Sequence, residues 1–168
     1  MYVPGNHDWS YFNNYHTEDS IKNELPLLNE FCRGNTAFQK IKIDELTFVG
    51  LDNGMDFYDS SLLGKVEDVL RTEDNVIFLQ HVPLSCPELA PDTVRVWRRD
   101  ICLGGGGIVI GDTADKMRDL ICSYPSSKAI LAGHLHDVVR CDFLNGKVPQ
   151  YVSEISCYGK VTVFNVSN

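Results

Sequence analysis

The residues best suited to chemistry lie in three separate segments of the chain. These are Gly5-Asn6-His7-Asp8, His81 after Gln80, and Gly133-His134-Leu135-His136. They contain all of the chain's five histidines except His16. Imidazole nitrogens combined with amide or carboxylate oxygens suit a divalent transition metal ion. The three segments therefore indicate a metal site. His7 has a different expected role, because its ring next to the Asp8 carboxylate can act as a general acid or base.

Two short apolar runs indicate how these segments come together. Residues 76–79 precede His81 and residues 129–132 precede Gly133, and such runs are typical of buried parallel strands. Loops at the C-terminal ends of neighbouring parallel strands open on one crevice. We therefore expect the three segments to form a single site, built by Asn6, His7, His81, His134 and His136.

Each segment has a plainer interpretation when it is considered alone. A histidine after a strand is usually a satisfied polar residue, and Asn-His-Asp is usually a turn. The three segments in this order favour a metal site instead. A structural zinc site is a weaker alternative, because such sites are closed cages of four ligands and are usually rich in cysteine.

The three segments resemble the last three of five ordered motifs in the calcineurin-like metallophosphoesterase superfamily: G-N-H-D/E, a single His, and G-H-x-H. They span residues 5–136, which is most of the chain. The resemblance implies an α/β (α+β) fold, with a two-sheet β-sandwich flanked by helices in one domain over residues 1–168. It also implies a phosphoesterase with a dinuclear metal centre of manganese, iron or zinc, which hydrolyses a phosphomonoester or a phosphodiester.

The resemblance further assigns a role to each matching residue. Asn6, His81 and His134 would bind one metal ion, and His136 would bind the other. His7 would face the scissile phosphate, and Asp8 would orient the His7 ring. The substrate would be a small molecule or a protein that carries a phosphoester.

The first two family motifs, D-x-H and G-D-x-x-D/N, do not precede Gly5 in this sequence. In the family they supply an Asp, a His and a bridging Asp to the metal ions. We therefore expect an N-terminally truncated, partial domain, with three ligands for one ion and one for the other. A second function stays open: an incomplete remnant that binds one metal ion or acts as an interaction module. Missing central strands would expose sheet edges, so we also expect a homo-oligomer or a missing N-terminal half supplied from elsewhere.

Residues 111–115, Gly-Asp-Thr-Ala-Asp, spell the second motif but fall in the wrong order along the chain. Asp112 or Thr113 is better interpreted as the cap of a following helix. Between residues 85 and 107 we expect a long irregular stretch that contains Arg95, Arg98 and Arg99. These arginines either bind an anionic group over the site or are solvated, and the sequence favours neither interpretation.

Composition excludes several classes of protein. The net charge of −8 argues against a nucleic-acid-binding surface, which is normally basic. No apolar run approaches the length that spans a membrane. The six cysteines include no C-x-x-C pair, and this scattered usage favours reduced thiols in a cytoplasmic protein.

Hydrophobic periodicity predicts the remaining elements. Helices are expected over residues 17–32, 60–71 and 114–122. Strands are expected over residues 37–43, 46–51, 76–80 and 128–132. A closing antiparallel run is expected over residues 138–143, 148–152 and 161–166, with a hairpin turn at Asn145-Gly146.

Overall fold

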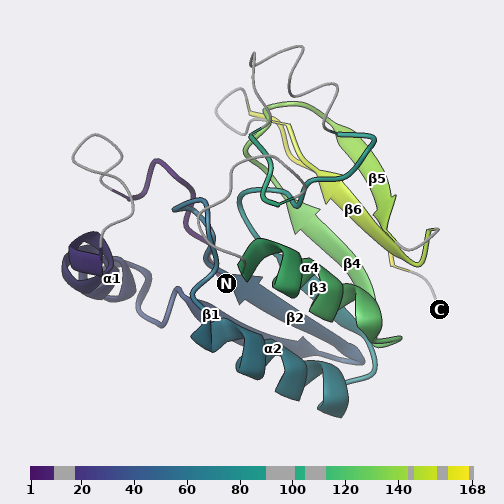
Figure 1. Cartoon of the computed structure of the whole chain (residues 1–168), viewed down its shortest axis with the longest axis horizontal. Coiled ribbons are helices and arrows are strands. Elements are labelled where there is room, and N and C mark those ends of the chain that lie inside the picture. The colour runs from purple at the N-terminus through teal and green to yellow at the C-terminus, as the bar shows by residue number, and fades with distance from the viewer. Residues whose placement is uncertain (10–17, 90–100, 105–112, 144–145, 155–158, 167–168) are drawn as a thin grey trace.

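The computed structural model describes residues 1–9, 18–89, 101–104, 113–143, 146–154 and 159–166. Their strands form one six-stranded sheet in the order β1-β2-β3-β4-β6-β5 (Figure 1). The strands are β1 (Phe38–Ile43), β2 (Leu46–Leu51), β3 (Val76–Leu79), β4 (Ser127–Ala132), β5 (Val139–Phe143) and β6 (Val148–Val152). Strands β2, β3, β4 and β6 are parallel, whereas β1 and β5 pair antiparallel at the two edges.

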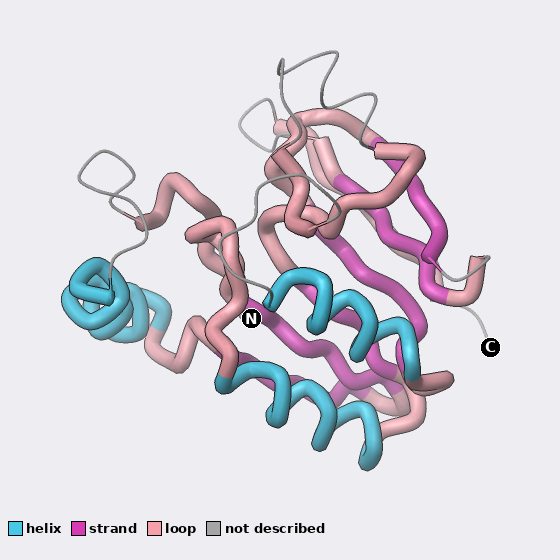
Figure 2. Tube along the Cα trace, in the orientation of Figure 1, coloured by secondary structure: helices cyan, strands magenta, loops and turns pink. Residues whose placement is uncertain are grey.

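Three helices accompany the sheet in the described part of the chain: α1 (Glu18–Cys32), α2 (Ser61–Thr72) and α4 (Thr113–Ser123). Helices α2 and α4 lie side by side over one face of the sheet, and α1 stands apart beside it (Figure 2). The apolar stripe of α2 buries Leu62, Val66 and Leu70 as its spacing predicts. The largest buried side chains of the core include Phe78, Met117, Ile121 and Ile130.

The C-terminal region differs from the expected antiparallel run. Strands β5 and β6 form the expected hairpin, with Gly146 at a φ of 86°. However, β6 pairs parallel with β4 and so lies between β4 and β5. Residues 161–166 form no strand and are exposed, with Val161 85% exposed. Their alternating β-branched residues indicate strand propensity, but no described strand pairs with them.

The α/β class is confirmed, and the sheet itself is simpler than the expected sandwich. All strands of the described residues belong to one sheet, because β6 extends that sheet beside β4 and does not begin a second one.

Helix α4 begins at Thr113, one residue earlier than predicted. The buried Oγ1 of Thr113 makes no hydrogen bond within the described structure, so Thr113 is not the helix cap. Asp112 lies outside the described residues.

The irregular stretch of residues 85–107 is anchored at both of its described ends. Leu84 and Leu103 form a parallel bridge, in which Ser85 N donates to Leu103 O at 2.8 Å. Both leucines are buried in the core. Arg95, Arg98 and Arg99 lie outside the described residues, so their expected role stays a prediction.

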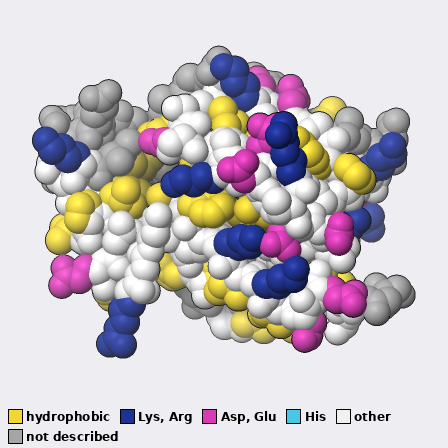
Figure 3. Space-filling view, turned by 90° about the horizontal axis from the view of Figure 1, so that it is seen from below, with side chains coloured by type: hydrophobic (Ala, Val, Ile, Leu, Met, Phe, Trp, Pro, Cys, Tyr) yellow, Lys and Arg dark blue, Asp and Glu magenta, His cyan; other side chains and the backbone are white. Residues whose placement is uncertain are grey.

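Two surface properties bear on possible partners. Across the described chain, no helix is both long enough and apolar enough to cross a membrane. On the face that Figure 3 presents, Lys and Arg side chains are interspersed with Asp and Glu and do not gather in one patch. No histidine side chain is visible on that face.

Candidate metal centre

Residues 5–8 form a tight turn that Asp8 closes. The amide of Asp8 donates to Gly5 O at 3.0 Å, and the amide of Gly5 donates to Asp8 Oδ2 at 2.7 Å. This turn buries Asn6, which is 6% exposed, and leaves His7 exposed. The Asp8 carboxylate thus closes the turn by accepting a hydrogen bond from the Gly5 amide.

Three of the predicted residues converge on one nitrogen atom. His81 follows β3, and its Nε2 lies 2.7 Å from Asn6 Oδ1. His134 follows β4, and its Nδ1 lies 3.2 Å from the same Nε2. Donors held about 2.1 Å from one ion stand roughly 3 Å from each other. The two distances from His81 Nε2 are therefore compatible with donors that share one metal ion.

The protonation state of His81 also suits metal binding. Burial lowers the pKa of His81 to about 4; nearby Asp8 opposes this shift, and His7 and His136 add to it. The imidazole is consequently neutral at pH 7, and a neutral ring nitrogen is the form that binds metal ions. These electrostatic effects also place His7, Asp8 and His136 in the neighbourhood of His81.

The loop after β4 carries His134 and His136 on an unusual backbone. Their φ angles are 69° and 59°, in the left-handed region that residues with a Cβ rarely adopt. This conformation costs roughly 1–2 kcal/mol per residue, and such strain is typical of functional sites. The loop is tied to its neighbour, because Gly133 N donates to His81 O at 2.9 Å. The side chain of His136 is exposed.

A third loop, which follows β2, supports the turn from behind. A Cβ on Gly54 would stand 2.9 Å from the carbonyl carbon and oxygen of Gly5, so only glycine fits there. Asn53, beside it, is 1% exposed and hydrogen-bonds to the backbone of His81. This loop is not among the segments that the sequence motifs predict for the site. The sequence signal for it is the Asn53-Gly54 turn pair, which follows the apolar strand after one residue, Asp52.

The described metal donors include few His, Cys, Asp or Glu side chains. No group of three or more His, Cys, Asp or Glu side chains stands at metal-binding spacing among the residues that the structure describes. The convergence consists of two imidazoles and one amide oxygen, which is a donor chemistry that fits a transition metal ion. Five cysteines in the described ranges carry free thiols: Cys32, Cys86, Cys102, Cys122 and Cys141.

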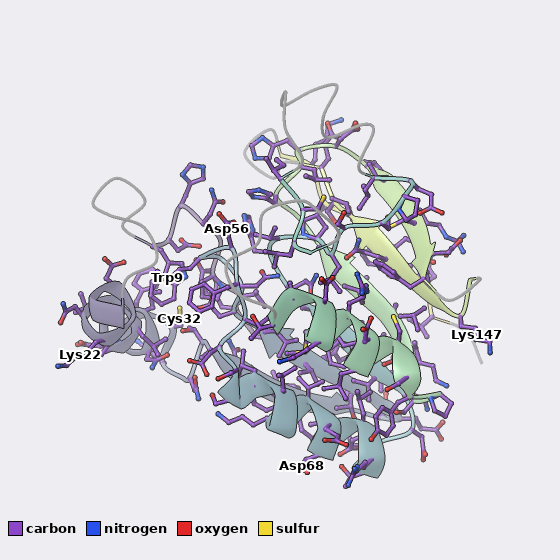
Figure 4. The ribbon with its side chains drawn as sticks, viewed as in Figure 1. Trp9, Lys22, Cys32, Asp56, Asp68 and Lys147 are labelled. Carbon is purple, nitrogen blue, oxygen red and sulfur yellow. The ribbon has the colours of Figure 1, made fainter. Side chains whose placement is uncertain are left out.

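A cavity of about 410 Å³ lies beside α1, away from the convergent donors. Trp9 is at this position, between α1 and the sheet (Figure 4), and its Nε1 donates to Asp52 Oδ1 at 3.3 Å. Asn6, His81, His134 and His136 are not among the residues that line it. The lining includes Trp9, Leu25, Asn29, Phe57, Leu62 and Lys65.

Comparison with known proteins agrees with this fold. The family model of the calcineurin-like phosphoesterases matches residues 1–138, so the chain belongs to that family. In fold it is similar to a dimetal phosphatase from Danio rerio, with a TM-score of 0.56 and 15% sequence identity. The likeness covers 91% of this chain and 60% of the phosphatase, so the chain spans less than two thirds of that protein's length. No curated protein matches the chain.

Proposed function

We propose that this chain forms part of a metal-dependent phosphoesterase that hydrolyses a phosphomonoester or a phosphodiester. The observation that carries the proposal is the convergence of Asn6 Oδ1 and His134 Nδ1 on His81 Nε2. These atoms come from three loops that are distant in the sequence and belong to the motifs shared with the family. Membership of the calcineurin-like phosphoesterases supports the reaction class.

In this proposal Asn6, His81 and His134 hold one divalent ion, and His136 contributes to a second. Manganese, iron and zinc all accept imidazole and oxygen donors. When bound, such ions act as Lewis acids toward a phosphoryl oxygen. The burial of His81 keeps its ring neutral and therefore able to bind an ion at pH 7.

His7 has a separate role in the proposal. It is exposed on the turn whose other side buries Asn6, so it can reach a substrate that approaches the ion. We assign it the transfer of a proton to the leaving-group oxygen. Asp8 fixes the turn through its hydrogen bond with the Gly5 amide and thereby sets the position of the residue before it.

A second function is favoured by one observation. The described donors converge at one position only, which supports a chain that binds a single ion without hydrolysis. The two functions differ in turnover and in metal stoichiometry. Both can be measured on the same preparation.

The test is the metal content of the folded chain after dialysis against Mn²⁺ or Zn²⁺. We expect bound metal in the wild type and its loss in His81→Ala and in His134→Ala. His16→Ala is the matched control, because it removes an imidazole outside the three motifs. Metal content that stays unchanged in either motif variant would overturn the ligand assignment.

Turnover of p-nitrophenyl phosphate and bis-p-nitrophenyl phosphate by the loaded chain then separates the two functions. Hydrolysis that disappears in His81→Ala supports the phosphoesterase. Metal binding without hydrolysis of either compound supports the single-ion alternative.

A further inference from the structure

Asn53 is a buried carboxamide that hydrogen-bonds to the loop carrying His81. Its Oδ1 accepts from the amides of His81 at 3.0 Å and of Val82 at 2.9 Å. Its Nδ2 donates to Val82 O at 2.8 Å and to the hydroxyl of Tyr58 at 3.2 Å. One side chain from the loop after β2 thus satisfies three backbone groups of the loop after β3.

A second layer of buried polar groups holds this arrangement in place. The hydroxyl of Tyr58 donates to Gln80 Oε1 at 2.6 Å, and Gln80 Nε2 donates to Val82 O at 3.0 Å. Tyr58 and Gln80 are 0% and 4% exposed. Within an apolar surrounding, hydrogen bonds of this kind are strong, and a missing partner is costly. The network therefore allows the His81 backbone little freedom.

Only a carboxamide supplies the contacts that Asn53 makes. A carboxylate accepts the two amides but cannot donate to Val82 O, and a methyl group does neither. Glutamine has the same functional group but is one methylene longer. Because the side chain at position 53 is only 1% exposed, the extra methylene would overpack the site. The position is therefore specific for asparagine.

We infer that Asn53 is a positioning residue, which sets the backbone of His81 so that its Nε2 meets Asn6 and His134. The metal-binding part of this inference rests on the proposed function. Residues that orient a metal ligand typically change metal affinity by roughly 10- to 100-fold when they are replaced. We expect a loss of that size in Asn53→Ala and in Asn53→Asp.

The experiment measures the Kd for Mn²⁺ or Zn²⁺ by calorimetric titration of the folded protein. Asn29→Ala is the control, because Asn29 Oδ1 also binds a loop, through the amide of Thr36 at 2.8 Å and its hydroxyl at 3.0 Å. Asn29 is on α1, and its hydrogen bonds hold residue 36 and not the loop that carries His81. We expect Asn29→Ala to keep the wild-type Kd although it loses comparable hydrogen bonds. An unchanged Kd in both Asn53 variants would overturn the inference.

A measurement without metal separates this inference from the proposed function. Amide hydrogen exchange at His81 and Val82 reports whether Asn53 holds the loop. We expect faster exchange at both amides in Asn53→Asp, which keeps the shape of the side chain, and no change in Asn29→Ala. If wild-type protein binds no metal, the proposed function fails, and the exchange rates still decide the role of Asn53. Protection that stays unchanged in Asn53→Asp would overturn that role.

Discussion

The imidazole of His81 lies directly against the backbone of Gly5. A Cβ on residue 5 would stand 2.9 Å from His81 Cε1 and 3.0 Å from Nδ1. Gly5 is not among the described glycines with a positive φ. The glycine at this position is therefore required by contact with the ring, and not by its backbone conformation.

Gly5→Ala should displace the His81 ring and weaken metal binding. We expect a loss of about 1–3 kcal/mol in the free energy of unfolding, which is typical of overpacking in a tight contact. Urea denaturation and metal titration measure the two effects. Gly64→Ala on α2 is the matched control, because its new Cβ meets nothing within 4 Å and alanine favours a helix. Wild-type metal affinity in Gly5→Ala would show that the ring moves aside without consequence.

His7→Ala should lower turnover and leave metal content intact. A positioned general acid typically contributes roughly 100- to 10,000-fold to rate, so kcat should fall within that range. The measurement pairs kcat on p-nitrophenyl phosphate with elemental analysis of the same sample. Loss of metal in this variant would mean that His7 is a ligand.

The left-handed backbone at His136 predicts an unusual order of stability. His136→Gly should be more stable than His136→Ala by about 1 kcal/mol, because only the glycine removes the conformational cost of a φ of 59°. Val138, in the same loop, is exposed and has no positive φ, so the order should reverse there. Urea denaturation of the four variants provides the test. Equal stability of the two His136 variants would argue that position 136 is unstrained.

Asp52 predicts a pH-dependent stability. Burial raises its pKa from 3.8 to about 6, against the opposing hydrogen bonds from Gly54 and Trp9. A raised pKa stabilises the fold fully below pH 3.8, and this contribution is lost as pH rises through 6. Asp52→Asn should therefore gain stability relative to the wild type between pH 4 and 7, on the order of 3 kcal/mol.

Urea denaturation of both proteins across that range measures the difference. Asp68→Asn, which removes an exposed carboxylate from α2, controls for the loss of a surface charge. A difference between Asp52→Asn and the wild type that is constant with pH would show that Asp52 titrates alike in the folded and unfolded chains.

The local elements of the fold were predictable because their signals are local. The periodicity of residues 60–71 and the apolar run before His81 each specify an element within a few residues. The position of β6 was not predictable in this way. Asn145-Gly146 indicates a hairpin, but no local signal states which strand of that hairpin joins β4. Residues 161–166 have strand propensity without a described partner, so propensity alone gave a wrong prediction there.

In the candidate site, too, the residues with a local sequence signal were predictable and the others were not. Asn6, His81 and His134 were predictable because each one stands in a motif at the end of a strand or in a turn. Asn53 was not, because its meaning depends on the amides of residues 81 and 82, which lie 28 and 29 positions away. Gly5 was predicted only as part of a motif. Its contact with the ring of His81 gives the physical reason why a glycine stands there.

The convergent donors have a consequence for how the protein folds. Asn6 and His81 are 75 positions apart, and His81 and His134 are 53 apart. Contacts this distant in sequence form slowly, because closing the long loops between them costs chain entropy before the contacts can stabilise the fold. No single hairpin or helix can assemble the three donors, so the proposed metal site is complete only in the globally folded chain. If the donors bind an ion as proposed, free ion at 100 times its Kd would stabilise the fully folded state by about 2.7 kcal/mol.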